Sequence, residues 1–112
     1  MTISAFESKD RAFVPYPAAG RNGGQARIAR LIGRHNSTSL SGGVVVYERL
    51  TVDWDLPFDE MITVIEGNLT IQSGGETFSL GAGDVAWFPA HTQLTYDVPD
   101  RVTLSYAIWP QP

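Results

Sequence analysis

The chain has 112 residues, 43% hydrophobic and 18% charged, with a formal net charge of −4 and no cysteine. This length and composition fit one soluble globular domain, and the missing cysteine excludes disulfides and thiolate metal sites. The acidic balance argues against nucleic acid as a partner, and no apolar run approaches the ~20 residues that span a membrane.

The first third of the chain shows little periodicity. Its beginning, MTISAFESKD, lacks the regions of a secretory signal, so we expect a cytoplasmic protein. Prolines and glycines within residues 1–25 predict an extended arm that packs on the domain. Residues 26–33 (ARIARLIG) fit a helix or a strand equally well. The nearby arginines favour a solvated face, with anion or partner contact as the alternative; they are Arg21, Arg27, Arg30 and Arg34.

From residue 43 onward, short runs rich in β-branched and aromatic residues alternate with turn residues. The runs span residues 44–52, 60–66, 69–72, 76–80, 85–88, 93–98 and 102–109. Gly67-Asn68 and Pro99-Asp100 are among the turns between them. Many strands at this spacing with no long helix predict an antiparallel sandwich or barrel.

Alternation along the strands predicts which side chains face the interior. One face of the first long run carries Val44, Val46, Glu48, Leu50 and Val52. The next carries Trp54, Leu56, Phe58, Glu60, Ile62 and Val64. Further interior positions are Leu69, Ile71, Phe78, Leu80, Leu94, Tyr96, Val98, Val102, Leu104, Tyr106 and Ile108. Pro57 could shift the register, and a slip of one residue would exchange the faces.

Two carboxylates, Glu48 and Glu60, therefore fall on predicted interior faces. Burial of an unpaired carboxylate costs several kcal/mol, so each needs a partner, a wet cavity or a raised pKa. A close pair would suit general acid/base chemistry or binding of an ammonium group. The alternative is structural, with each glutamate paired to an arginine or hydrogen-bonded to Tyr106 or a tryptophan indole.

Other chemistry is sparse. His35 lies in a polar, loop-like stretch, whereas His91 follows Pro89 in a turn and could approach a barrel opening. No two histidines stand at metal-ligand spacing, although Glu48, Glu60 and His91 together remain a weaker metal possibility. The chain has no nucleophile elbow and no phosphate-binding loop.

Two segments resemble the cupin motifs. In FDEMITVIEG, Glu60 precedes Gly67 as at the end of the first motif, and GDVAWFP resembles the start of the second. WDLPFDE, VIEG, GAGDVAWFP and YAIWP narrow the resemblance to the cupin domain of the ethanolamine-utilisation EutQ family, over about residues 40–110.

The departures from this resemblance limit what it implies. Metal-dependent cupins supply three histidines and a glutamate, and of these positions only Glu60 is retained. The histidine positions fall within residues 53–56 and at Leu94, and His91 stands where a glycine is expected. Oxygenase chemistry is therefore not expected. The acetate-kinase activity proposed for EutQ proteins belongs to longer chains with an added N-terminal region, which we expect this chain to lack, so it is not carried over.

We therefore expect one all-β cupin domain over residues 1–112, a small antiparallel barrel of jelly-roll type. Residues 1–39 would form the arm and first strand, and residues 40–110 the core. The resemblance implies a homodimer. We expect a small polar ligand and no metal or cofactor, with isomerase, lyase or cyclase chemistry if the protein is an enzyme. The expected catalytic groups are Glu60, Glu48 and Tyr106, and the expected ligand contacts are Trp54, Trp87, His91 and Tyr96. The alternative is a non-catalytic accessory or structural protein of a metabolic gene cluster.

Overall fold

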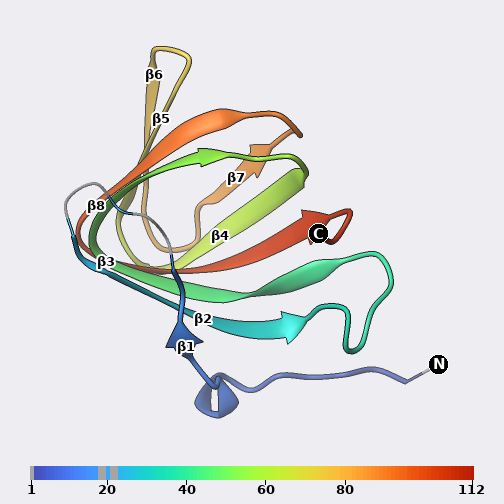
Figure 1. Cartoon of the computed structure of the whole chain (residues 1–112). Helices are drawn as coiled ribbons and strands as arrows, with labels where there is room; N and C mark the ends of the chain where they lie inside the picture. Colours follow the sequence, from blue (N-terminus) through green and yellow to red (C-terminus); the bar gives the residue numbers. More distant parts are fainter. Residues whose placement is uncertain (1, 18–19, 21–22) are drawn as a thin grey trace.

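An antiparallel sheet of eight strands curls around a central core (Figure 1). The computed structural model describes residues 2–17, 20 and 23–112, so Arg21 of the arginine cluster lies outside the described residues. The elements are η1 (Ser8–Asp10), β1 (Val14–Pro15), β2 (Gln25–Ile32), β3 (Ser41–Asp55), β4 (Asp59–Gly67), β5 (Leu69–Ser73), β6 (Glu76–Leu80), β7 (Val85–Phe88) and β8 (Gln93–Trp109). The expectation of an all-β fold is confirmed, and residues 26–32 belong to strand β2, with Gly33 just beyond its end.

Two long strands, β3 and β8, form the centre of the sheet. The strand order is β1-β2-β3-β8-β4-β7, and β5 pairs with both β6 and β8. β3 and β8 pair from Ser41↔Ile108 to Asp55↔Gln93 and curve together around the core (Figure 1). The turn expected at Pro99-Asp100 does not form, because the two runs on either side of it are halves of the single bent strand β8.

A β-bulge between β3 and β8 corrects one of the predicted faces. The register between β3 and β8 shifts between Glu48 and Leu50, and Arg49 adopts a positive φ of 49°. Arg49 alone lies opposite Pro99 and Asp100 of β8, and at this irregularity the interior face of β3 changes from odd-numbered to even-numbered residues. Val45 and Tyr47 therefore share the interior with residues from Leu50 onward. Val44 and Val46 are buried as predicted, each 3% exposed, but they lie outside the main cluster, on the other face of β3. Glu48 shares that face and does not point into the main core, because the faces of β3 change at the irregularity.

The rest of the core largely follows the alternation. Ile62 and Val64 of β4 pack in the main cluster, so Pro57 does not shift the register. The β8 residues in the cluster or packed against it are Leu94, Tyr96, Val98, Val102, Leu104 and Tyr106. Phe78 is an exception and is 47% exposed. It lies on β6, which pairs only with β5 and projects beyond the rest of the sheet (Figure 1).

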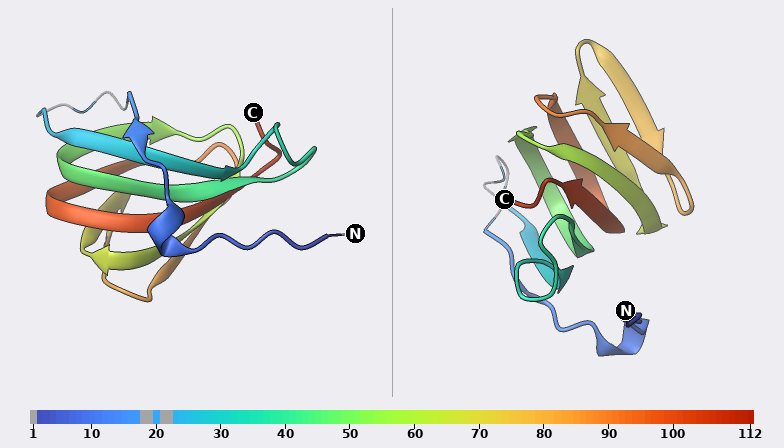
Figure 2. Two further views of the ribbon diagram at one scale, coloured as in Figure 1. Left: turned by 90° about the horizontal axis from the view of Figure 1, so that it is seen from below. Right: turned by 90° about the vertical axis from the view of Figure 1, so that its right-hand side faces the viewer.

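The N-terminal segment lies outside this core. β1 pairs with β2 over two residues, and the preceding chain extends away from the sheet (Figures 1 and 2). The guanidinium carbon of Arg27 lies over the Phe13 ring, 5.5 Å from the ring centroid. Nearer the N-terminus, Ile3 is 93% exposed. Within the described residues, no helix has the length and apolarity needed to cross a membrane.

Candidate functional site

A cavity of about 400 Å³ lies inside the curled sheet. It is lined by residues of β2, β3, β4 and β8, by Tyr16 after β1, and by the loop that follows β2. The chain has four tyrosines, Tyr16, Tyr47, Tyr96 and Tyr106, and all of them line this cavity. Its apolar walls include Ile28, Val45, Leu56, Phe58, Leu104 and Ile108. The volume falls in the range of small-molecule sites.

Glu60 reaches this cavity from the start of β4. It pairs in register with Phe88 of β7 and Ile108 of β8, so apolar side chains flank it on both neighbouring strands. Burial in these surroundings raises the pKa of the Glu60 carboxyl from 4.5 to about 7. Among the described residues, no hydrogen bond or ion pair satisfies it. The structural alternative, in which an arginine or Tyr106 holds Glu60, therefore has no support in its contacts.

The tyrosine hydroxyls form the polar part of the cavity. Burial raises the pKa of each, most strongly for Tyr47 and Tyr96, and the negative charge of Glu60 raises all four further. The phenols therefore stay protonated at neutral pH and can each donate a hydrogen bond. An oxyanion formed near Glu60 would find such donors around it.

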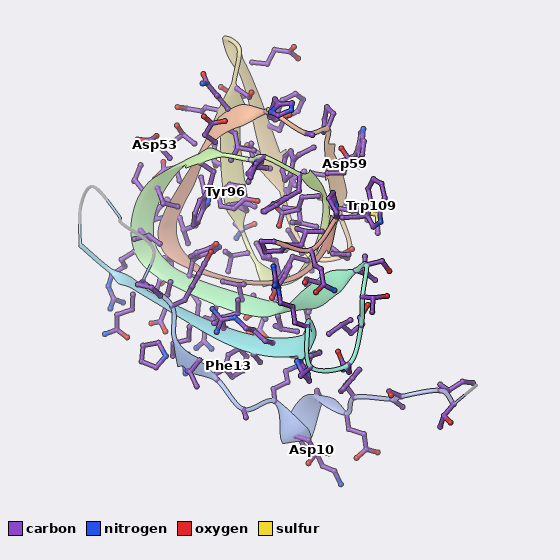
Figure 3. All side chains as sticks on the ribbon, turned by 45° about the vertical axis from the view of Figure 1, so that its right-hand side comes forward. Asp10, Phe13, Asp53, Asp59, Tyr96 and Trp109 are labelled. Atoms are coloured by element: carbon purple, nitrogen blue, oxygen red, sulfur yellow. The ribbon has the colours of Figure 1, made fainter. Side chains whose placement is uncertain are left out.

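Aromatic contacts fix several of these groups. Trp54 stacks on Tyr16, with ring centroids 6.1 Å apart, and its indole hydrogen-bonds to Tyr47. Tyr47 meets Tyr96 edge to face at 5.8 Å, and Tyr96 in turn packs against Phe88. Figure 3 shows Tyr96 inside the ring of strands, with Asp53 and Trp109 on its outer side. The cavity wall is thus held by mutual packing.

The structure brings together only part of the predicted site. Glu60, Tyr106, Trp54 and Tyr96 line the cavity; Glu48, Trp87 and His91 do not. Glu48 lies on the opposite face of β3, where its Oε1 is 3.4 Å from Nη2 of Arg27. Trp87 is 60% exposed, opposite Met61 on the outer side of the β4–β7 pair.

His91 is a turn residue. Its φ of 72° lies in the left-handed region, and its backbone N–H donates to the carbonyl of Leu56 at 2.6 Å. Its side chain is exposed, away from the cavity. A glycine is expected at this position of the motif because glycine adopts such a φ without steric cost.

The residues present do not fit the metal centre of metal-dependent cupins. No group of three or more histidine, cysteine, aspartate or glutamate side chains in metal-binding arrangement occurs within residues 2–17, 20 and 23–112. The possibility of a site formed by Glu48, Glu60 and His91 is wrong, because only Glu60 of the three faces the cavity.

Several cavity residues were not predicted from the sequence, among them Tyr47, Tyr16, Arg30 and His35. Tyr47 was hidden by the bulge, and Tyr16 lies in a segment without periodicity. Arg30 shares a face of β2 with Ile28 and Ile32, which would have indicated an inward position had the segment been taken as a strand. No local signal in the sequence brings Tyr16 to Trp54, because that contact depends on how the arm crosses the sheet.

Comparison with known proteins agrees with this architecture. Residues 19–112 match the family model described as ethanolamine utilisation protein EutQ. The chain is 30% identical over 83 residues to acetate kinase EutQ of Salmonella typhimurium, a match that covers 74% of this chain and 36% of that protein. The chain thus spans about a third of the length of this curated relative.

Solved structures show the same fold. A crystal structure of a putative EutQ protein from Salmonella typhimurium superposes with a TM-score of 0.88 at 24% identity, over 98% of this chain and 88% of that one. An RmlC-like cupin from Shewanella frigidimarina gives a TM-score of 0.74 at 16% identity, over 97% and 92% of the two chains. The fold is therefore that of a cupin, and the chain belongs to the EutQ family.

Proposed function

We propose that this EutQ-family cupin binds a small polar molecule in its cavity and exchanges a proton with it through Glu60. The observation that carries this proposal is an unpaired carboxyl, with its pKa raised to about 7, inside a cavity of about 400 Å³. An acid or base is most useful when its pKa lies near the working pH, because both protonation states are then populated. Perturbed carboxyls in cavities are typical of functional sites.

The surrounding groups suit proton transfer next to a carbonyl. The Glu60 carboxylate would accept a proton from the carbon beside the carbonyl, and the C–H electron pair would move to the carbonyl oxygen. Donors such as Tyr106 and Tyr16 would hold the resulting enolate oxygen. Return of the proton to another carbon gives an isomer, and departure of a leaving group with its electron pair gives an elimination product. These are isomerase and lyase reactions. In a cyclase reaction, the enolate carbon would instead attack a second carbonyl of the same molecule, and the proton on Glu60 would pass to the alkoxide so formed.

The test is a screen of small carbonyl compounds in D2O. Compounds that raise the melting temperature of the protein are ligands of its folded state. We expect NMR to show deuterium entering the C–H next to the carbonyl of at least one of them. Glu60→Gln should slow this exchange by about 100-fold or more, whereas Glu48→Gln should leave it unchanged. Equal exchange by wild type and Glu60→Gln would exclude Glu60 as the base.

An accessory role on the outer surface is the second candidate. Met61 and Trp87 face each other across β4 and β7, and Trp109 is exposed at the end of β8 on the same sheet. Exposed apolar side chains of this size are typical of protein contacts. If this role is the main one, Trp87→Ser should fail to complement a strain lacking the gene while Glu60→Gln succeeds. Sedimentation of wild type and Trp87→Ser tests whether the partner is a second copy of the chain.

A further inference from the structure

Arg30 stands out among the cavity residues because its charge has no partner. It projects from β2 on the same face as Ile28 and Ile32, both of which line the cavity. Its side chain is exposed, so it lies where the cavity reaches the surface. No ion pair or hydrogen bond to Arg30 occurs in the described part of the chain. Arg27, on the opposite face of the same strand, pairs with Glu48 and covers Phe13.

The positive charge of Arg30 acts on the cavity hydroxyls. Burial is the main cause of the raised pKa of Tyr106. The second largest effect comes from Arg30, which lowers that pKa. Tyr16 responds to both Glu60, which raises its pKa, and Arg30, which lowers it. These two phenols therefore lie within reach of both charges. For Glu60 itself, burial is the resolved cause of the raised pKa, and no compensation by Arg30 is resolved.

A second guanidinium faces the same cavity. Arg34, in the loop after β2, donates from Nε to the carbonyl oxygen of Pro112 at 2.8 Å, which leaves its terminal N–H groups for other partners. Glu60 is the one acidic side chain among the described residues that line the cavity, and His35 and Pro112 line it too. Two guanidinium groups, those of Arg30 and Arg34, thus face a cavity whose one acidic side chain among the described residues is Glu60, although the chain has a net charge of −4. A cavity lined by positive charge in a chain that is negative overall favours the binding of anions.

We propose that the ligand of this cavity is an organic anion, with its oxyanion group at Arg30 and its apolar body among the aromatic walls. A guanidinium presents a planar pair of donors that matches a carboxylate or a phosphate. The walls formed by Ile28, Phe58 and Trp54 suit a planar or hydrocarbon body. The inference rests on the proposed function, since it names the ligand class for the same cavity, and it makes Arg30 a specificity-determining residue.

The test compares two probes that share a body and differ in charge, 2-naphthoate and 2-naphthamide. Isothermal titration calorimetry measures both dissociation constants for wild type, Arg30→Gln and Arg27→Gln, with circular dichroism to verify folding. We expect wild type to bind the naphthoate at least ~10-fold more tightly, a preference within the ordinary range for charge-assisted hydrogen bonds. Arg30→Gln should reduce this preference to about 2-fold, and Arg27→Gln should retain it.

Three results would overturn the inference: equal binding of the two probes by wild type, binding of neither, or an unchanged preference in Arg30→Gln. A Glu60→Gln arm separates this inference from the proposed function, because it should keep the preference for naphthoate. If the protein prefers the anion but exchanges no proton in D2O, the anion site is supported and the proposed acid/base role of Glu60 is excluded. Proton exchange without any preference for the anion supports the acid/base role and overturns the inference.

Discussion

Arg30 and Glu60 line the same cavity without forming an ion pair with each other. A carboxylate that is buried without a partner carries an uncompensated desolvation cost. Here the pKa values of Tyr16 and Tyr106 are raised by burial and by Glu60 and lowered by Arg30, so both hydroxyls lie within reach of the two charges. In our proposals, Arg30 is the anion-binding group of this cavity and Glu60 is its proton-exchanging group. A molecule that contacts both would fill the space between them.

Replacement of Glu60 should change how stability depends on pH. The folded-state pKa is about 7 against 4.5 for the ordinary side chain, so the folded protein holds this proton more tightly. The contribution of this group to stability is therefore complete below pH 4.5 and is lost as the pH rises through 7. Glu60→Gln stays neutral and should be more stable than wild type at about pH 8, by up to ~3 kcal/mol.

Urea unfolding at about pH 4.5, 6, 7 and 8 measures this difference, which should shrink toward zero at the acidic end. A variant that is less stable than wild type at the alkaline end would show that Glu60 is a paired structural residue.

Replacement of Glu48 should have little effect on folding. Its ion pair with Arg27 spans 3.4 Å, and the two side chains are 22% and 40% exposed. Water screens such a pair, so Glu48→Gln should cost less than ~1 kcal/mol in the free energy of unfolding. Ligand affinity and proton exchange should match those of wild type. A loss of either would mean that the outer face of β3 contributes to the site.

Gly43→Ala should both destabilise the domain and crowd the cavity. A Cβ at Gly43 would overlap the carbonyl oxygen of Ala29 and lie 3.2 Å from Oη of Tyr106. Relief requires a shift of the β2–β3 backbone, so we expect a cost of about 1–3 kcal/mol and weaker ligand binding. Gly33→Ala is the matched control, because its Cβ would come no closer than 3.5 Å to the His35 ring. Thermal denaturation should separate the two variants clearly.

His91→Gly should stabilise the turn between β7 and β8. His91 has a φ of 72°, at which a side chain costs about 1 kcal/mol and glycine costs little. We expect a gain of up to ~1 kcal/mol in the unfolding free energy, with ligand binding unchanged. Ala90→Gly, one residue earlier and without a positive φ, should instead lose stability. Lost binding in His91→Gly would restore His91 as a ligand contact.

The fold class and the inward-facing carboxylate of Glu60 could both be predicted from the sequence alone. Its β-rich runs and turns predict an antiparallel all-β domain, and the motif around Glu60 and Gly67 places it among cupins of the EutQ family. Alternation also put Glu60, Trp54 and Tyr106 on inward faces correctly. These successes share a physical basis, since a strand that is buried on one face imposes a period of two on its own residues.

Which other residues line the cavity with Glu60 depends on the tertiary structure. A single bulge at Arg49 turned Glu48 outward and Tyr47 inward, and the sequence shows no mark of it, because it depends on how β3 bends with β8. The same holds for Arg30 and Tyr16, which reach the cavity through the pairing of β2 and the arm with the sheet. Local pattern sets the face of a strand, but contacts between distant segments set the composition of a site.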